Sequence, residues 1–217
     1  MMGVLSNVAS FFRDGGPFMF IILGVAVVIA AVVMERMWVI GRASSLRCGK
    51  FIRDATQAVY QGNVPLALHT AKQVRTPVGQ VAAAVLSARR FTEEDLRAAA
   101  DASALVALPP LSRRLPYLNM LANSATLLGL LGTIFGLTTA FSAVGAADLS
   151  QRSVFLAAGI SQALNTTALG LIIAVPTLLL HGFLAAKVDR IAEQVDEAAV
   201  ALIQALATQT RSAEKAA

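Results

Sequence analysis

The chain has 217 residues, of which 56% are hydrophobic and 14% are charged, whereas a soluble domain of this size carries about 25% charged residues. The net charge of +5 does not indicate nucleic-acid binding, because the basic residues flank apolar stretches and the sequence shows no zinc spacing, RNA-binding motif or basic-aromatic patch. We therefore expect an integral membrane protein that makes no contact with nucleic acid.

Three stretches contain no Asp, Glu, Lys or Arg: residues 15–34, 115–147 and 153–186. About 20 apolar residues cross the ~30 Å hydrocarbon layer of a bilayer, so the first stretch is just long enough and the other two exceed that length. No period-two alternation and no Asn-Gly or Asp-Gly hairpin turn indicates a β-strand. The predicted fold is an all-α membrane protein with three transmembrane helices and long helical cytoplasmic extensions.

The N-terminal stretch Met1–Phe12 is uncharged, and its Leu5, Val8, Phe11 and Phe12 lie roughly on one helical face. This pattern predicts a short helix at the membrane interface. A basic region and a cleavage site are absent, so we expect the first apolar stretch to be a retained span and not a signal peptide. That span begins near Pro17 and ends near Ile40.

The segment between the first two spans is polar and has helical spacing broken by turn signals. A first short helix is expected around Phe51-Ile52-Ala55-Val59 and a second over Pro65–Val74. A third begins at Thr76-Pro77 and carries Val78, Val81, Val85 and Leu86, and a fourth has a capped, acidic start at Thr92–Asp95 and reaches Ala107. Pro109-Pro110 should interrupt the last of these before span two.

Spans two and three are joined by a short loop and should form an antiparallel hairpin. The helix of span three is expected to continue to about Ala207, with Val188, Ile191, Val195, Ala199 and Leu202 on one face. The three predicted spans are residues 15–40, 115–145 and 154–186. Residues 1–14 form an N-terminal periplasmic or interfacial segment, and residues 146–153 form a periplasmic loop. Residues 41–114 form a cytoplasmic helical domain, and residues 187–217 form a cytoplasmic C-terminal helix and tail.

The orientation in the membrane follows from the basic residues. Of 18 Lys and Arg, 15 lie in the two polar segments, residues 41–114 and 187–217, and Arg36 lies near the inner end of span one, so only Arg13 and Arg152 lie on the other side. The positive-inside rule therefore places residues 41–114 and the C-terminus in the cytoplasm and the N-terminus in the periplasm.

Polar side chains inside the spans are the candidates for function. Asn119, Thr126 and Thr133 are seven residues apart and share one face of span two. Span three has a polar cluster in its outer half, consisting of Gln162, Asn165, Thr166 and Thr167. Such groups serve either helix-to-helix hydrogen bonds, worth ~0.6 kcal/mol on average, or an ion path. Asn119 fits the first explanation better, and for Thr133 and the cluster both stay open.

Small residues in the same spans predict close helix packing. They are Gly129, Gly132 and Gly136 in span two, and Gly170 with Ala174 in span three. Pro176 removes an intrahelical hydrogen bond to the carbonyl of Ile172, which the hydroxyl of Thr177 could satisfy.

The membrane interior of each span lacks Asp and Glu. Threonine and glutamine hold water but do not titrate near pH 7, so an acid for proton transfer would have to come from another chain. His181, near the inner end of span three, is more simply a hydrogen-bonded structural residue. Cys48 is the only cysteine and is expected to be a packed structural residue. We find no P-loop, nucleophile elbow or metal-ligand cluster, so neither an enzyme nor a metal or cofactor site is expected.

Two segments resemble the signatures of the TolQ/ExbB proteins of the MotA/TolQ/ExbB proton channel family. Leu118–Phe141 resembles the second-span signature and Gly159–Pro176 the third-span signature, and Ser112–Leu118 resembles the entry into span two. The topology, length and loop sizes also match over essentially the whole chain.

This resemblance implies a function as the stator and proton-channel subunit of an ion-driven motor in the bacterial inner membrane. It implies a homopentameric ring around a dimer of a TolR/ExbD-like protein, whose single transmembrane helix bears an essential Asp. The family's pore-lining threonines correspond to Thr133 and Thr167, and we add Thr166, Gln162 and Thr126 as candidate lining residues. Many relatives have Glu where this chain has Gln162, so a role for that glutamate does not carry over.

Two other functions compete with the stator. A passive scaffold that anchors envelope proteins would tolerate loss of the Thr133 and Thr167 hydroxyls. A small-solute transporter has less support, because the sequence shows no inverted repeat and no pair of broken helices.

Overall fold

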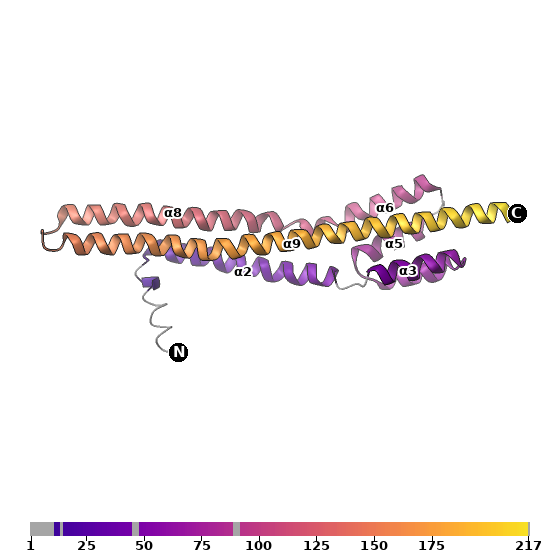
Figure 1. Cartoon of the computed structure of the whole chain (residues 1–217), viewed down its shortest axis with the longest axis horizontal. Helices are drawn as coiled ribbons and strands as arrows, with labels where there is room; N and C mark the ends of the chain where they lie inside the picture. Colours follow the sequence, from indigo (N-terminus) through magenta and orange to yellow (C-terminus); the bar gives the residue numbers. More distant parts are fainter. Residues whose placement is uncertain (1–10, 14, 45–47, 89–91, 217) are drawn as a thin grey trace, which may run out of the picture. The chain divides into compact units, whose positions relative to one another are not determined.

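The computed structural model describes residues 11–13, 15–44, 48–88 and 92–216, and every regular element within them is helical. In chain order the helices are α2 (Pro17–Ala43), α3 (Cys48–Tyr60), α4 (Val64–Gln73), α5 (Pro77–Leu86), α6 (Glu93–Ala107), α7 (Pro109–Ser112), α8 (Leu115–Ala146) and α9 (Arg152–Ala216) (Figure 1). They form two compact units. Unit 1 holds the described residues up to Glu35 together with Leu115–Gly182, and unit 2 holds those of Arg36–Arg114 and Phe183–Ala217.

The predicted all-α fold with three long apolar helices is confirmed. Among the described residues, α2, α8 and α9 each contain a stretch long and apolar enough to cross a membrane. Large apolar side chains point outward along these stretches, including Phe20, Val27, Met34, Leu127, Phe141, Leu164 and Leu179. Contact of these apolar side chains with water is unfavourable, whereas contact with lipid tails is not. A helix can lie in lipid because its backbone groups bond to one another. The chain is a membrane protein.

A row of small residues brings α8 and α9 together in unit 1, where the two helices run side by side (Figure 1). On α8 the buried small residues recur every three or four positions, at Ala122, Ala125, Gly129, Gly132, Gly136 and Ala140. This spacing places them on one face of the helix. We call this contact, together with the α9 residues Gly159, Ala163, Thr166, Gly170 and Ala174, the small-residue seam.

The seam leaves no room for a side chain at its glycines. A methyl group at Gly170 would lie 2.7 Å from the carbonyl oxygen of Ala125, and one at Gly129 would lie 3.2 Å from the carbonyl oxygen of Thr166. At Gly136 the neighbour is the backbone nitrogen of Ala163, at 3.1 Å. Because backbone atoms are the obstacle, no rotamer change can relieve the contact.

The first span packs on the hairpin through its N-terminal half. Met19 and Ile22 of α2 are fully buried and form a cluster with Leu169 of α9. The rings of Phe18 and Phe135 are 5.3 Å apart, which adds a contact to α8. Phe11 and Phe12 also pack against this cluster, and the rest of the interfacial helix predicted for Met1–Phe12 lies outside the described residues.

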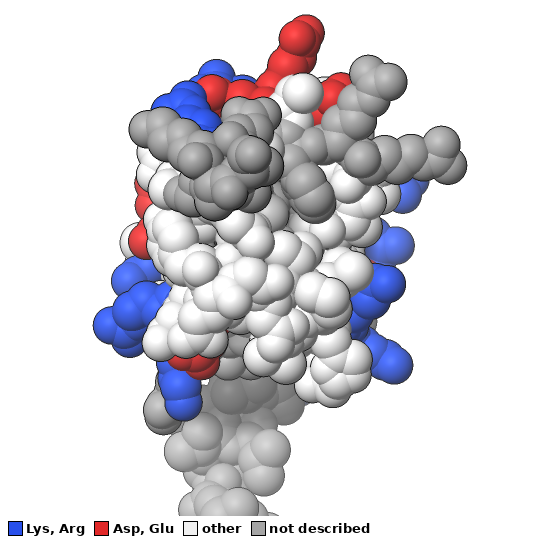
Figure 2. Space-filling model, turned by 90° about the vertical axis from the view of Figure 1, so that its right-hand side faces the viewer, with Lys and Arg blue, Asp and Glu red and all other residues white. Residues whose placement is uncertain are grey.

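Unit 2 has an apolar core of its own. Helices α3, α4, α5 and α6 surround the C-terminal part of α9, with Val59, Val81, Leu96 and Leu202 among the fully buried side chains. All five residues predicted to share a face of α9 are buried, and Val195, Ala199 and Leu202 belong to this core. Lys and Arg lie along both sides of the face shown in Figure 2, and most of its centre is uncharged.

Capping side chains set the starts of the short helices, and the cap predicted at Thr92 is confirmed. Asn63 accepts a hydrogen bond from the Leu66 amide, Thr76 from Gly79 and Thr92 from Asp95. Gly62, just before α4, has φ of +79°, which glycine adopts without strain. The helix starts follow from these local signals.

One helix continues beyond its predicted end. Helix α9 extends to Ala216, since no Gly or Pro follows Ala207. The helix of the first span, α2, continues to Ala43. The predicted interruption at Pro109 and Pro110 is confirmed. These two prolines begin the short helix α7, because proline fits the first turn of a helix.

We predict that Gly170→Ala destabilises the protein by about 1–3 kcal/mol, the usual range for overpacking a close contact. The added methyl would force the backbones of α8 and α9 apart. The control is Gly24→Ala in α2, where nothing in this chain lies within 4 Å of the new methyl. The measurement is the midpoint of thermal unfolding of the detergent-solubilised protein, followed by circular dichroism. Equal midpoints for the two variants would contradict the tight seam.

Candidate functional site

The candidate site lies on the α8–α9 hairpin, where threonine hydroxyls border the small-residue seam. Thr167 of α9 is half-buried, and its hydroxyl donates to the carbonyl of Gly129 on α8 over 3.1 Å. This hydrogen bond links the two helices through residues that are 38 positions apart in the sequence. The bond can form because Gly129 has no side chain to hold the Thr167 backbone away. A methyl group added at Gly129 would lie only 3.3 Å from the Cα of Thr167.

Thr166 occupies a different place from its neighbour. Its side chain is only 1% exposed, and its hydroxyl donates to the Ala163 carbonyl at 2.8 Å and the Gln162 carbonyl at 3.2 Å. A methyl group at Gly132 would lie 2.7 Å from the Thr166 hydroxyl oxygen. Thr166 therefore fills the seam itself, where packing against Gly132 accounts for its burial.

The threonines of α8 bond within their own helix. The half-exposed Thr133 donates to the Leu130 carbonyl over 2.6 Å, and the exposed Thr126 donates to the Ala122 carbonyl over 3.3 Å. Asn119, on the same face, is exposed. The structure thus brings Thr166 and Thr167 against Gly129 and Gly132, but does not join Thr126 or Thr133 to the α9 cluster by a hydrogen bond.

Gln162 lies at a cavity in the half of the hairpin nearest the loop between α8 and α9. The cavity has a volume of about 400 Å³ and polar walls formed by Thr139, Ser161 and Gln162 beside Gly136 and Phe155. The amide of Gln162 is packed against Gly16, whose φ is +71°. A side chain at position 16 would be strained by that φ and would collide with this amide, so the turn before α2 is fitted to Gln162.

Pro176 is accommodated without a break in α9. The Thr177 hydroxyl donates to the carbonyl of Ile173 over 2.6 Å, whereas we expected it to satisfy Ile172. The reason is geometric, since a threonine hydroxyl reaches the carbonyl three or four residues before it on the same helix.

Some packing residues were not singled out in the sequence. A methyl group at Gly159 would collide with Ala140, and Ala163 faces Gly136 across the seam. Their signal is present, because small residues recur at 159, 163, 166 and 170 with the three-to-four spacing of one helix face. Gly16 had no such signal, since its contact with Gln162 joins residues far apart in the chain.

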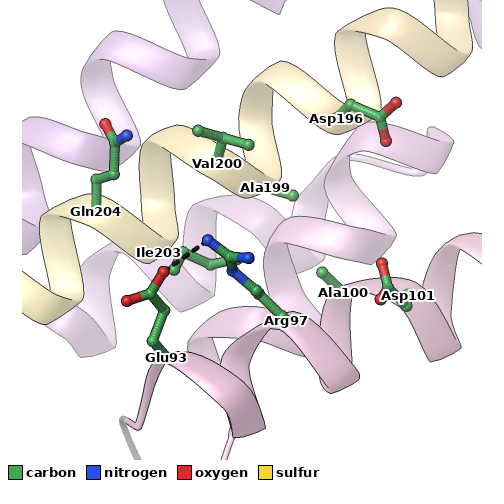
Figure 3. A pocket seen from close by; sticks show the side chains of 9 residues that line it. All are labelled: Glu93, Arg97, Ala100, Asp101, Asp196, Ala199, Val200, Ile203 and Gln204. Carbon is green, nitrogen blue, oxygen red and sulfur yellow. Dashed lines mark hydrogen bonds and ion pairs between the residues drawn. The ribbon is translucent and has the colours of Figure 1, made fainter.

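Unit 2 contains a second cavity, of about 420 Å³, between α6 and α9. Ala100, Ala199 and Ile203 form its apolar surface, and the acidic Asp101 and Asp196 lie at one end (Figure 3). Arg97 pairs with Glu93 one helical turn earlier at 2.6 Å. Both partners are more than half exposed, so this pair supports α6 by less than about 1 kcal/mol.

No cluster of three or more His, Cys, Asp or Glu able to hold a metal ion occurs among the described residues. The lone Cys48 is buried, as predicted. Burial raises the pKa of the Cys48 thiol above its usual value, and the nearby carboxylate of Glu197 raises it further.

We therefore predict slow alkylation of Cys48 by iodoacetamide at pH 8, because little thiolate forms in the native state. A Cys48→Ser, Tyr60→Cys double variant, with its cysteine at an exposed position, should react several-fold faster, as mass spectrometry can measure. The pKa of Cys48 is higher in the folded state than in the unfolded state. The stability that follows from this difference is fully present at pH values below the ordinary thiol pKa, and it is lost as the pH rises through the pKa of the folded state. Equal alkylation rates would contradict the burial of Cys48.

Residues 73–197 match the model of the MotA/TolQ/ExbB proton channel family. An ExbB-like biopolymer transport protein of Synechocystis is 29% identical over 160 residues, 73% of this chain and 75% of the relative. An ExbB homologue of Methanothermobacter thermautotrophicus is 23% identical over 189 residues, 87% of this chain and 67% of the relative. The Tol-Pal system protein TolQ of Haemophilus influenzae is 35% identical over 81 residues, 37% of this chain and 35% of the relative.

Proposed function

This chain belongs to the MotA/TolQ/ExbB proton channel family, and on that premise we propose that it is the stator and channel subunit of an ion-driven complex. Several copies, in the proposal a pentamer, surround a dimer of a single-span TolR/ExbD-like protein. Protons move down their gradient past an aspartate in the partner's membrane helix, and the complex converts this movement into mechanical work. The relatives named ExbB and TolQ support the proposal.

The observation that carries the proposal is the state of the Thr167 and Thr133 hydroxyls. Each already donates its proton to a backbone carbonyl, at Gly129 and Leu130 respectively, and each side chain is only half-buried. A hydroxyl has one donor and two acceptor lone pairs. These oxygens therefore keep lone pairs that can accept a hydrogen bond from water or from a protonated carboxylic acid without titrating themselves.

The acid itself must come from a partner in this scheme. The charge-free stretches 115–147 and 153–186 contain no carboxylate, and a proton relay needs a group that binds and releases protons. The amide of Gln162 does not titrate. The partner's aspartate is then the single titrating group, and the cavity beside Gln162 gives water a place at the outer end of the path.

The proposed location is the bacterial inner membrane, with residues 15–40, 115–145 and 154–186 as the spans. The N-terminus and the loop 146–153 face the periplasm, and residues 41–114 and 187–217 face the cytoplasm. The asymmetry of the basic residues supports this orientation. The role is that of a channel subunit, and we assign no catalytic step to it.

We predict that Thr167→Val or Thr133→Val, co-expressed with the single-span partner, lowers proton flux by about tenfold or more. Valine keeps the shape of threonine but removes a hydrogen bond to a charged or protonated group, which is worth about 1.5–3 kcal/mol. Flux would be measured as acidification of proteoliposomes that hold the co-purified complex and a pH-sensitive dye.

Two control variants separate ion passage from structure. Thr138→Val removes a hydroxyl that bonds within α8 at 2.7 Å on another face of the helix, and it should leave flux unchanged. Thr167→Ser keeps the hydroxyl and should therefore retain most of the wild-type flux, unlike Thr167→Val. Wild-type flux from Thr167→Val and Thr133→Val, with the complex still assembled, would instead favour a passive scaffold.

A further inference from the structure

Unit 2 contains a small open cavity, of about 270 Å³, where the last turns of α2 meet α5, α6 and α7. Its walls include two arginines from different elements, Arg42 at the end of α2 and Arg75 just before α5. Trp38, Val106 and Pro110 add apolar surface. We call this cavity the Trp38 pocket. The proton path proposed above makes no use of it.

The charge of the Trp38 pocket favours an anion. Besides the two arginines its lining contains one uncharged polar side chain, Gln80, and no Asp or Glu among the described residues. The guanidinium of Arg42 lies over the ring of Trp38, 5.8 Å from its centroid. This cation–π contact orients the guanidinium. Two guanidinium groups at one cavity match the oxygens of a phosphate, which arginine binds through paired N–H donors.

The same pocket also presents apolar surface to its surroundings. Trp38 is 68% exposed and Val106 is 74% exposed, and the adjacent Leu105 is 75% exposed. A soluble phosphate ion makes no use of such surface, because it has no apolar part to bury. A ligand that satisfies both the arginines and the apolar rim is an amphiphile with an anionic headgroup.

The position along α2 agrees with this chemistry. From Pro17 to Trp38 the helix rises about 32 Å at 1.5 Å per residue, close to the ~30 Å thickness of the hydrocarbon layer. Trp38 and Arg42 therefore fall at the level where interfacial aromatic and basic side chains meet lipid headgroups. The buried Arg36 donates to the carbonyl of Pro110 over 3.0 Å, which fixes α7 against this end of α2.

From these observations we propose that the Trp38 pocket binds the phosphate headgroup of an anionic phospholipid, held by Arg42 and Arg75 with the acyl chains along the exposed apolar rim. Basic pockets at the cytoplasmic side of membrane helices bind such headgroups. Arg75 is the discriminating residue, because it contributes charge while Arg42 also supports the stacked position of Trp38. The proposal depends on the membrane location of α2 and not on proton conduction.

The test uses the fact that Trp38 is the only tryptophan of the chain, so its fluorescence reports on this pocket alone. The full-length protein is placed in nanodiscs made of phosphatidylcholine. An increasing fraction of this lipid is replaced by phosphatidylglycerol that is brominated on its acyl chains. Bromine quenches tryptophan at short range. We expect half-maximal quenching at a mole fraction several-fold lower than with brominated phosphatidylcholine.

Charge-matched variants locate the binding site. Arg75→Gln should raise the half-maximal mole fraction of brominated phosphatidylglycerol about fivefold, since one basic residue near an anionic membrane has roughly that effect on affinity. Arg53→Gln, an exposed arginine of α3 outside the pocket, makes the same change in net charge and should have little effect. Circular dichroism would verify that both variants remain folded.

Three results would overturn the proposal. The first is equal quenching by the two brominated lipids. The second is an equal loss for Arg75→Gln and Arg53→Gln, which would indicate diffuse electrostatic attraction. The third is an equally large fluorescence change with inorganic phosphate in a pure phosphatidylcholine nanodisc, which would identify a soluble anion as the ligand.

Discussion

Unit 1 depends on the direct approach of the α8 backbone to the α9 backbone at Gly129 and Gly170. Lipid tails are as apolar as leucine, so the hydrophobic effect does not draw helices together inside a bilayer, and close van der Waals contact must do so. Such contact requires small side chains, and the seam supplies them at every turn. The seam also brings the Gly129 carbonyl within reach of the Thr167 hydroxyl, so the polar feature of the hairpin follows from the packing.

Much of the fold could be predicted because its signals are local. The absence of charge over residues 15–34, 115–147 and 153–186 identifies the long apolar helices. Asn63, Thr76 and Thr92 mark the starts of α4, α5 and α6 because each caps the amide three residues ahead. The length of α9 was underestimated, since nothing after Ala207 stops the helix and the sequence alone gives no reason to end it there.

The candidate site was less predictable, because its details depend on contacts between distant residues. Thr166 and Thr167 are neighbours of the same type, and from the sequence both are candidate pore-lining residues. The structure buries Thr166 against Gly132 and turns Thr167 toward Gly129, a distinction that depends on the rotation of α9 about its own axis. The packing of Gln162 on Gly16 and the meeting of Arg42 with Arg75 likewise join segments that the sequence does not show to be neighbours.

The direction of the threonine hydrogen bonds has a consequence for selectivity. With their protons committed to carbonyls, the oxygens of Thr133 and Thr167 present only the negative ends of their dipoles outward. A passage bordered by such oxygens stabilises hydronium and metal cations but offers no donor to chloride. If these residues line the path that we propose, the stretch that they border would favour cations over anions even while the partner's acid is neutral.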